Sequence, residues 1–135
     1  MPKQFPLDAP GFHPFAELIG LRFTKSGKGH SECVLEINER LLNPHKVIHG
    51  GAVYSMADTG MGAALYSHLA KDEICATVEI KIVYFAALAS GLLTCKTKVI
   101  HRGKRIAVLE SEIRGNNRLI AKAIGTYSIF KAKGD

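Results

Sequence analysis

One stretch of small and apolar residues, 49–69, most constrains what this chain can fold into. It is the one segment patterned as a long helix, and it carries a single carboxylate, Asp58. No lysine or arginine occurs in this segment before Lys71. A helix with so little surface charge is buried on most sides. We therefore predict a central helix that ends near Lys71 and is enclosed by the rest of the chain.

Strand-like alternation of apolar and polar residues occupies most of the remaining sequence. Before the long helix, the patterns predict a short helix over 13–19 and a hairpin of strands 21–25 and 30–37. After it, four strands joined by short turns, and therefore antiparallel, are expected at about 77–85, 92–101, 105–113 and 119–130. This order predicts an α+β fold in which about six strands curve around one helix. Because one helix cannot cover a broad sheet, we also expect a dimer.

The 135 residues are enough for one hydrophobic core, so a single domain over 1–135 is expected. Residues 1–14 hold four of the five prolines and are predicted to be an extended lead-in without a core of its own. The three cysteines are widely spaced and are interpreted as buried thiols in a reducing compartment. The start of the chain lacks the apolar stretch of a signal peptide, and no run approaches the roughly 20 residues of a membrane span. A cytoplasmic protein without a membrane partner is expected.

The net charge of +6 favours an anionic partner. Basic residues cluster at Lys96, Lys98 and His101 and in the turn Arg102-Gly103-Lys104-Arg105. Such a turn presents cations and backbone N–H groups to phosphates, although a solvated hairpin is the alternative. Residues 96–105 contain no aromatic side chain for stacking on bases, so nucleic acid is not the expected partner. The six histidines show no metal-like spacing with acidic residues, and no metal site is expected.

Two features of the long helix are candidates for chemistry. Gly50 and Gly51 leave the helix N-terminus sterically open, so that its unpaired N–H groups can form an oxyanion hole. The alternative is that the two glycines only permit a tight turn packed on the sheet. Asp58 lies on an apolar surface without a cation nearby in the helix, which favours a functional role for this carboxylate over a structural one. Eight residues separate Gly50 from Asp58, or about 12 Å along a helix axis. If both act on one carbonyl carbon, they must come from two different subunits.

The segment 43–51, NPHKVIHGG, with Asp58 nine residues after His49, resembles the hotdog-fold acyl-CoA thioesterases of the phenylacetate-degradation type. That resemblance implies that the Gly50 N–H polarises the thioester carbonyl, while Asp58 of the partner subunit is the nucleophile or general base. It implies that His49 supports the turn near the thioester. Asn43 would hold water or the thioester, and Thr77 would orient water. It also implies a homodimer, or a dimer of dimers, that needs no cofactor because coenzyme A is part of the substrate.

The acyl group is expected to be small or medium, with aromatic groups included. Gly51, Tyr54 and Met61 are the candidate acyl-binding residues, and the basic turn 102–105 is the candidate site for the phosphates of coenzyme A. Two other functions of the same fold stay open. One is non-catalytic binding of acyl-CoA. The other is a hydratase or dehydratase, which requires a histidine and an acid over the acyl β-carbon.

Overall fold

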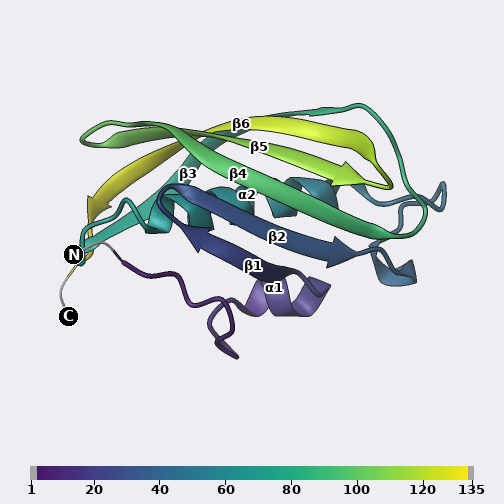
Figure 1. Ribbon diagram of the computed structural model, residues 1–135, viewed down its shortest axis with the longest axis horizontal. Helices are drawn as coiled ribbons and strands as arrows, with labels where there is room; N and C mark the ends of the chain where they lie inside the picture. Colours follow the sequence, from purple (N-terminus) through teal and green to yellow (C-terminus); the bar gives the residue numbers. More distant parts are fainter. Residues whose placement is uncertain (1–2, 134–135) are drawn as a thin grey trace.

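An antiparallel sheet of six strands curves around one long helix (Figure 1). The computed structural model describes residues 3–133. The helices are α1 (Pro14–Ile19), the 3-10 turn η1 (Glu39–Leu41) and α2 (Gly50–Tyr66). The strands are β1 (Arg22–Gly27), β2 (His30–Glu36), β3 (Glu73–Tyr84), β4 (Leu92–Arg102), β5 (Ile106–Gly115) and β6 (Arg118–Lys131). The predicted α+β fold with one central helix and six strands is confirmed.

The order of the strands across the sheet is β1-β2-β4-β5-β6-β3. The sequence predicted that the four late strands follow one another as antiparallel neighbours. This is right for β4, β5 and β6, but β3 pairs with β6 and not with β4. The chain therefore crosses beneath the sheet through α2, forms the far edge as β3, and returns over residues 85–91 to lie beside β2. This crossover places α2 against the concave face, and β1 and β3 form the edges of the sheet.

Helix α2 is shorter than predicted and β3 is longer. The helix ends at Tyr66 and not near Lys71, because the Ser67 hydroxyl accepts a hydrogen bond from the Gly29 N–H (2.9 Å) and ties the chain to the β1–β2 turn. Strand β3 begins at Glu73, four residues before the expected start. Its first residue is held by Arg102, whose Nη2 lies 2.7 Å from the Glu73 carboxylate. The polar residues that seemed to break the helix pattern thus belong to a strand edge.

Small residues let α2 lie close to the sheet. The buried side of the helix includes Val53, Met56, Ala57, Gly60, Met61, Ala63, Ala64 and Leu65. A Cβ atom at Gly60 would lie 2.8 Å from the Thr97 hydroxyl of β4. Buried hydroxyls of the sheet bond to the helix: Ser31 donates to the Gly60 carbonyl (2.6 Å) and Ser111 to the Ala57 carbonyl (3.5 Å), while Thr97 and Ser111 bond to each other within the sheet (2.7 Å). Another side of the helix carries Asp58, whose carboxylate is directed toward Thr77 of β3 and Tyr127 of β6.

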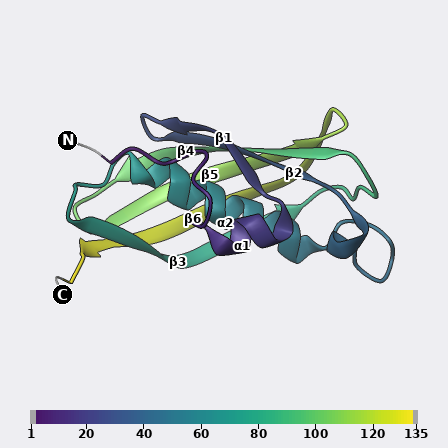
Figure 2. The same ribbon diagram turned by 90° about the horizontal axis from the view of Figure 1, so that it is seen from below.

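The N-terminal segment lies across this outer side of α2, together with α1 (Figure 2). Within the part of the chain that the structure describes, no helix is long and apolar enough to cross a membrane.

We predict that Gly60→Ala destabilises the fold by about 1–3 kcal/mol, because the added methyl displaces Thr97 and disturbs its bond to Ser111. Gly62→Ala is the matched control on the same helix, since a Cβ there meets nothing within 4 Å. Without a clash, alanine in place of a helical glycine stabilises by up to about 1 kcal/mol. Urea unfolding of both variants measures the difference. Equal stability of the two variants would contradict the proposed close contact.

Candidate active site

A cleft of about 410 Å³ opens over the outer side of α2. Its floor is formed by α2 residues that include Asp58 and Gly62. One wall is β3 with Thr77 and the end of β6 with Tyr127, and the other wall is the N-terminal segment with α1. The cleft therefore combines polar groups on the strand side with aromatic rings on the side of the N-terminal segment.

The Asp58 carboxylate is fixed by two hydroxyl donors. The Thr77 hydroxyl donates to Asp58 Oδ1 at 2.7 Å, and the Tyr127 hydroxyl lies 2.5 Å from the same oxygen and 2.7 Å from the Asp58 carbonyl oxygen. Among the hydrogen bonds and ion pairs found within residues 3–133, none engages Oδ2 and none joins Asp58 to a lysine or arginine. The carboxylate is held in place without being neutralised, and one of its oxygens stays available for a proton.

The pairing of β3 with β6 brings these donors together. Thr77 and Tyr127 are directly opposite partners in the ladder, so their side chains share the face toward α2. A register shift follows Thr77, between Thr77 and Glu79. Burial, and secondarily the hydrogen bond to Asp58, raise the pKa of the Tyr127 phenol far above its ordinary value of 10.0. Tyr127 therefore remains a protonated donor at any physiological pH.

Sequence reasoning missed Tyr127, although the pattern of β6 contains a signal. The inward positions of this strand are occupied by Ala121, Ala123 and Gly125, which leave room for α2, and then by Tyr127. A tyrosine among small residues that face a helix needs a buried partner for its hydroxyl. That partner had to be a polar group of α2, and Asp58 was the one carboxylate on it.

His49 caps the N-terminus of α2. Its Nδ1 accepts the Gly51 N–H at 2.7 Å, which requires that the ring proton of the neutral imidazole is on Nε2. The Gly51 N–H is thus occupied, whereas the Gly50 N–H donates to none of the acceptors found in residues 3–133. The backbone of His49 is extended, with φ −67° and ψ 134°, as is usual for the residue that caps a helix N-terminus. The helix N-terminus consequently offers one free backbone donor, at Gly50.

A second hollow of about 220 Å³ lies at this helix start and includes His49 and Gly51. Phe15 and Ser55 border both this hollow and the Asp58 cleft, so the two adjoin along the helix. Neither His49 nor Gly50 lines the Asp58 cleft, and Asp58 does not line the second hollow. Within one protomer, the two halves of the candidate site stay apart.

The structure places the other candidates outside the Asp58 cleft. Asn43 Oδ1 accepts the N–H groups of His45 (2.8 Å) and Val47 (3.4 Å), so it organises its own loop and leaves only its amide NH₂ for a ligand. Met61 is fully buried beneath Gly125 and does not line the cleft. Tyr54 is half-buried and likewise does not line it.

Arg102, a candidate for binding phosphates, is already engaged within the protein. Its guanidinium pairs with Glu73 and donates to the carbonyl oxygens of His68, Gly103 and Lys104. It thereby anchors the turn between β4 and β5. The cations of this turn that remain exposed are Lys104 and Arg105.

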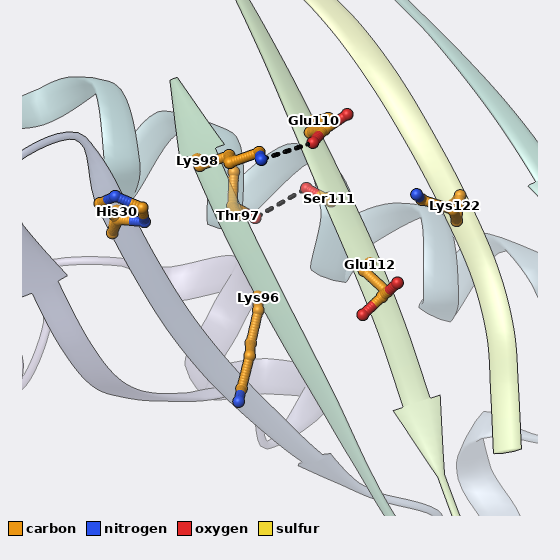
Figure 3. Close-up of a pocket in the computed structure, with 8 residues that line it drawn as sticks. All are labelled: His30, Lys96, Thr97, Lys98, Glu110, Ser111, Glu112 and Lys122. Atoms are coloured by element: carbon orange, nitrogen blue, oxygen red, sulfur yellow. Dashed lines mark hydrogen bonds and ion pairs between the residues drawn. The ribbon is translucent and has the colours of Figure 1, made fainter. Parts of the chain in front are cut away.

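A hollow on the opposite, outer face of the sheet is lined mainly by charged side chains of both signs (Figure 3). Lys98 pairs with Glu110 at 3.2 Å there, and Lys96 lies 4.0 Å from Glu32. Such mixed, exposed ion pairs are typical of a solvated sheet face. In the described part of the chain, no three His, Cys, Asp or Glu side chains are arranged to hold a metal ion.

Comparison with known proteins identifies related chains. The sequence profile described as the thioesterase superfamily matches residues 45–121. The 1,4-dihydroxy-2-naphthoyl-CoA hydrolase of Listeria monocytogenes is 30% identical, over 72% of this chain and 79% of that protein. The acyl-coenzyme A thioesterase PaaI of Escherichia coli is 29% identical, over 87% and 79%. Among solved structures, a conserved protein of Pseudomonas aeruginosa is 38% identical, with a TM-score of 0.84 over 88% of this chain and 95% of that one.

We predict that the Tyr127 hydroxyl makes stability depend on alkaline pH. Above pH 10 the unfolded chain loses this phenolic proton while the folded chain retains it, so the stability present below pH 10 declines as pH rises. Tyr127 contributes about 1.4 kcal/mol per pH unit to the slope, and Tyr127→Phe should remove this contribution. The same variant should be less stable at neutral pH by about 1–3 kcal/mol, because the bond to Asp58 is lost.

Urea unfolding at several values between about pH 8 and pH 11 measures this slope. Tyr66→Phe is the matched control, since Tyr66 makes none of the bonds to Asp58, and it should keep the wild-type slope. An unchanged slope in Tyr127→Phe would show that Tyr127 does not hold its proton through this contact.

Proposed function

Because the chain belongs to the thioesterase superfamily and is a thioester hydrolase, we propose that it hydrolyses small or medium acyl-CoA thioesters, aromatic ones included, at a site shared by two subunits. The observation that carries this proposal is the Asp58 carboxylate, held by Thr77 and Tyr127 in an open cleft. A fixed, un-neutralised carboxylate can take a proton from water or attack the carbonyl carbon itself.

In the general-base form of the reaction, water attacks the thioester carbonyl carbon and gives its proton to Asp58. The carbonyl oxygen gains negative charge, the C–S bond breaks, and the CoA thiolate leaves and takes up the proton. The products are a carboxylic acid and free CoA, and Asp58 returns to its ionised form. Water is the only other reactant, so the reaction needs no cofactor.

The oxyanion donor is the free Gly50 N–H at the N-terminus of α2, where the helix dipole adds to the attraction for negative charge. Within one chain, this N–H is about 12 Å from Asp58. We therefore place the Gly50 N–H of one subunit opposite Asp58 of the other. The exposed Nε2–H of His49 and the amide NH₂ of Asn43 belong to the loop that leads into α2, and we assign them as two further donors for the thioester or water.

The free edge of β3 supports a two-fold partner. It is a long edge strand with exposed apolar side chains, among them Ile74, Val78 (59% exposed) and Val83. Unpaired edges of this kind favour pairing with another strand. A β3–β3 contact across a two-fold axis continues the sheet and sets the two α2 helices antiparallel, with their outer sides adjacent. Assembly into a dimer of dimers and a cytoplasmic location stay predictions.

The exposed Lys104 and Arg105 are the groups that we assign to the phosphates of coenzyme A. Gly103 permits the tight turn that presents them, since a Cβ there would lie 3.0 Å from the Ile106 carbonyl oxygen, and Arg102 braces this turn.

We predict that Asp58→Asn lowers turnover by at least about 10²-fold while the fold and the dimer persist. The amide oxygen can still accept the Thr77 hydroxyl, but it cannot take a proton. Asp72→Asn is the matched control, because Asp72 is exposed, pairs with Lys131 and lies outside the cleft.

Thiol release from acetyl-, hexanoyl-, benzoyl- and phenylacetyl-CoA, and from carrier-protein thioesters, measures this activity. Full turnover by Asp58→Asn would refute the assignment of Asp58. Tight acyl-CoA binding by the wild type without any thiol release would instead favour a non-catalytic binding protein.

We predict that two inactive chains complement each other. Gly50→Pro removes the proposed donor and keeps the backbone geometry, since proline is tolerated at the first helical position and the extended backbone of His49 suits a following proline. Its Cβ lies 3.3 Å from the Tyr84 ring, a contact that alanine at this position shares. Gly50→Ala keeps the N–H and is its control. A heterodimer of Gly50→Pro and Asp58→Asn chains regains one intact site of two if the site is shared between subunits. Differently tagged, co-expressed chains purified as heterodimers test this, and absence of any recovery would place the site within one chain.

A further inference from the structure

The N-terminal segment, residues 3–13, covers the outer side of α2 beside the Asp58 cleft (Figure 2). Its anchor is Phe5, whose ring packs edge-on against Phe12, Phe23 and Tyr66, with centroid distances of 5.5, 4.7 and 5.4 Å. These rings come from the segment itself, from β1 and from α2. Edge-to-face contacts of this kind fix the orientation of each ring. The segment is therefore packed against the domain as one wall of the cleft, in addition to being the extended lead-in that the prolines suggested.

Four of the aromatic side chains that line the cleft form what we call the aromatic wall: Phe5, Phe12, Phe15 and Tyr66. Two of them remain widely exposed although they adjoin a packed cluster, Phe12 at 44% and Phe15 at 48%. Large apolar side chains grouped at a cleft mark a surface that a ligand or partner covers. The floor between this wall and Asp58 is formed by small residues such as Gly62, where even a Cβ atom would meet open space.

Charge decides which kind of group fits there. The cleft contains the Asp58 carboxylate and no lysine or arginine among its lining residues, and the nearby Lys3 ammonium is engaged over the Tyr66 ring, 5.4 Å from its centroid. A ligand that carries its own carboxylate is repelled, whereas an uncharged apolar group covers the exposed rings. The volume of about 410 Å³ falls in the range of pockets that enclose small molecules.

We propose that the aromatic wall binds the acyl group of the thioester and makes the site selective for bulky, uncharged apolar acyl groups over acetyl and over acyl groups with a free carboxylate. This inference rests on the proposed thioester hydrolysis at Asp58. The reacting carbonyl then lies at the polar end of the cleft, beside Asp58, and the remainder of the acyl group extends toward Phe12 and Phe15. The aromatic wall and the proposed base belong to the same chain.

The test compares two alanine variants in the same segment. Phe12 lines the cleft, whereas Leu7 is similarly exposed (42%) but does not line it. Phe12→Ala should lower kcat/KM for phenylacetyl-CoA about tenfold relative to kcat/KM for acetyl-CoA, and Leu7→Ala should leave this ratio at its wild-type value. Phe12→Leu, which keeps an apolar side chain, should recover most of the ratio. In the wild type, succinyl-CoA should be a poorer substrate than phenylacetyl-CoA.

The possible outcomes separate the inference from the function on which it rests. Equal losses on all acyl-CoAs, or dissociation of the dimer in Phe12→Ala, would show that the wall has a structural or interface role and would overturn the selectivity. Thioester hydrolysis would then still stand, because the Asp58→Asn control tests it independently. Absence of thiol release by the wild type from every substrate would overturn both proposals.

Discussion

The close contact between α2 and the concave face of the sheet is the constraint on which the other features depend. Gly60 lies against Thr97, and Gly125 of β6 leaves room for the Met61 side chain, so neither position accommodates a larger residue without a shift. A helix seated this deeply has one side left to border a cleft between β3 and the N-terminal segment, and it is the side that carries Asp58. The geometry of the site is thus a consequence of core packing, because the same contact fixes the height of Asp58 relative to β3 and β6.

The hydroxyl partners of Asp58 explain how a carboxylate can be both positioned and reactive. A lysine or arginine at this place would fix the carboxylate but would also offset its charge and compete for its oxygens. Thr77 and Tyr127 donate hydrogen bonds without adding charge, and both engage Oδ1. Burial keeps the pKa of Tyr127 so high that it stays a donor. Oδ2 is left for a proton or for the carbonyl carbon, which is what either form of the proposed reaction requires.

Local patterns predicted the elements of the fold, but not all of their neighbours. The alternation of apolar residues and the small-residue helix were sufficient for six strands and one central helix. The place of β3 was not predictable in this way. The connection over 85–91 has seven residues, which is long enough either for a turn to a neighbouring strand or for a crossing to the other side of the sheet. The alternation of apolar and polar residues does not record which edge of the sheet a strand joins. The spacing of Gly50 and Asp58 was predictable, since a helix fixes it. Tyr127 was missed because its contact with Asp58 depends on that β3–β6 pairing and on packing across 69 residues of chain.

Division of the proposed site between subunits assigns different tasks to the two chains. Asp58, its two donors and the aromatic wall belong to one chain, because α2, β3, β6 and the N-terminal segment meet in a single protomer. In the proposed arrangement, the Gly50 N–H comes from the partner, together with His49 and Asn43. Choice of acyl group and activation of water are therefore coupled within one chain, whereas stabilisation of the oxyanion depends on assembly. A change in the aromatic wall alters which thioester is selected without disturbing the oxyanion donor, and a change at the β3 edge removes that donor from every substrate alike.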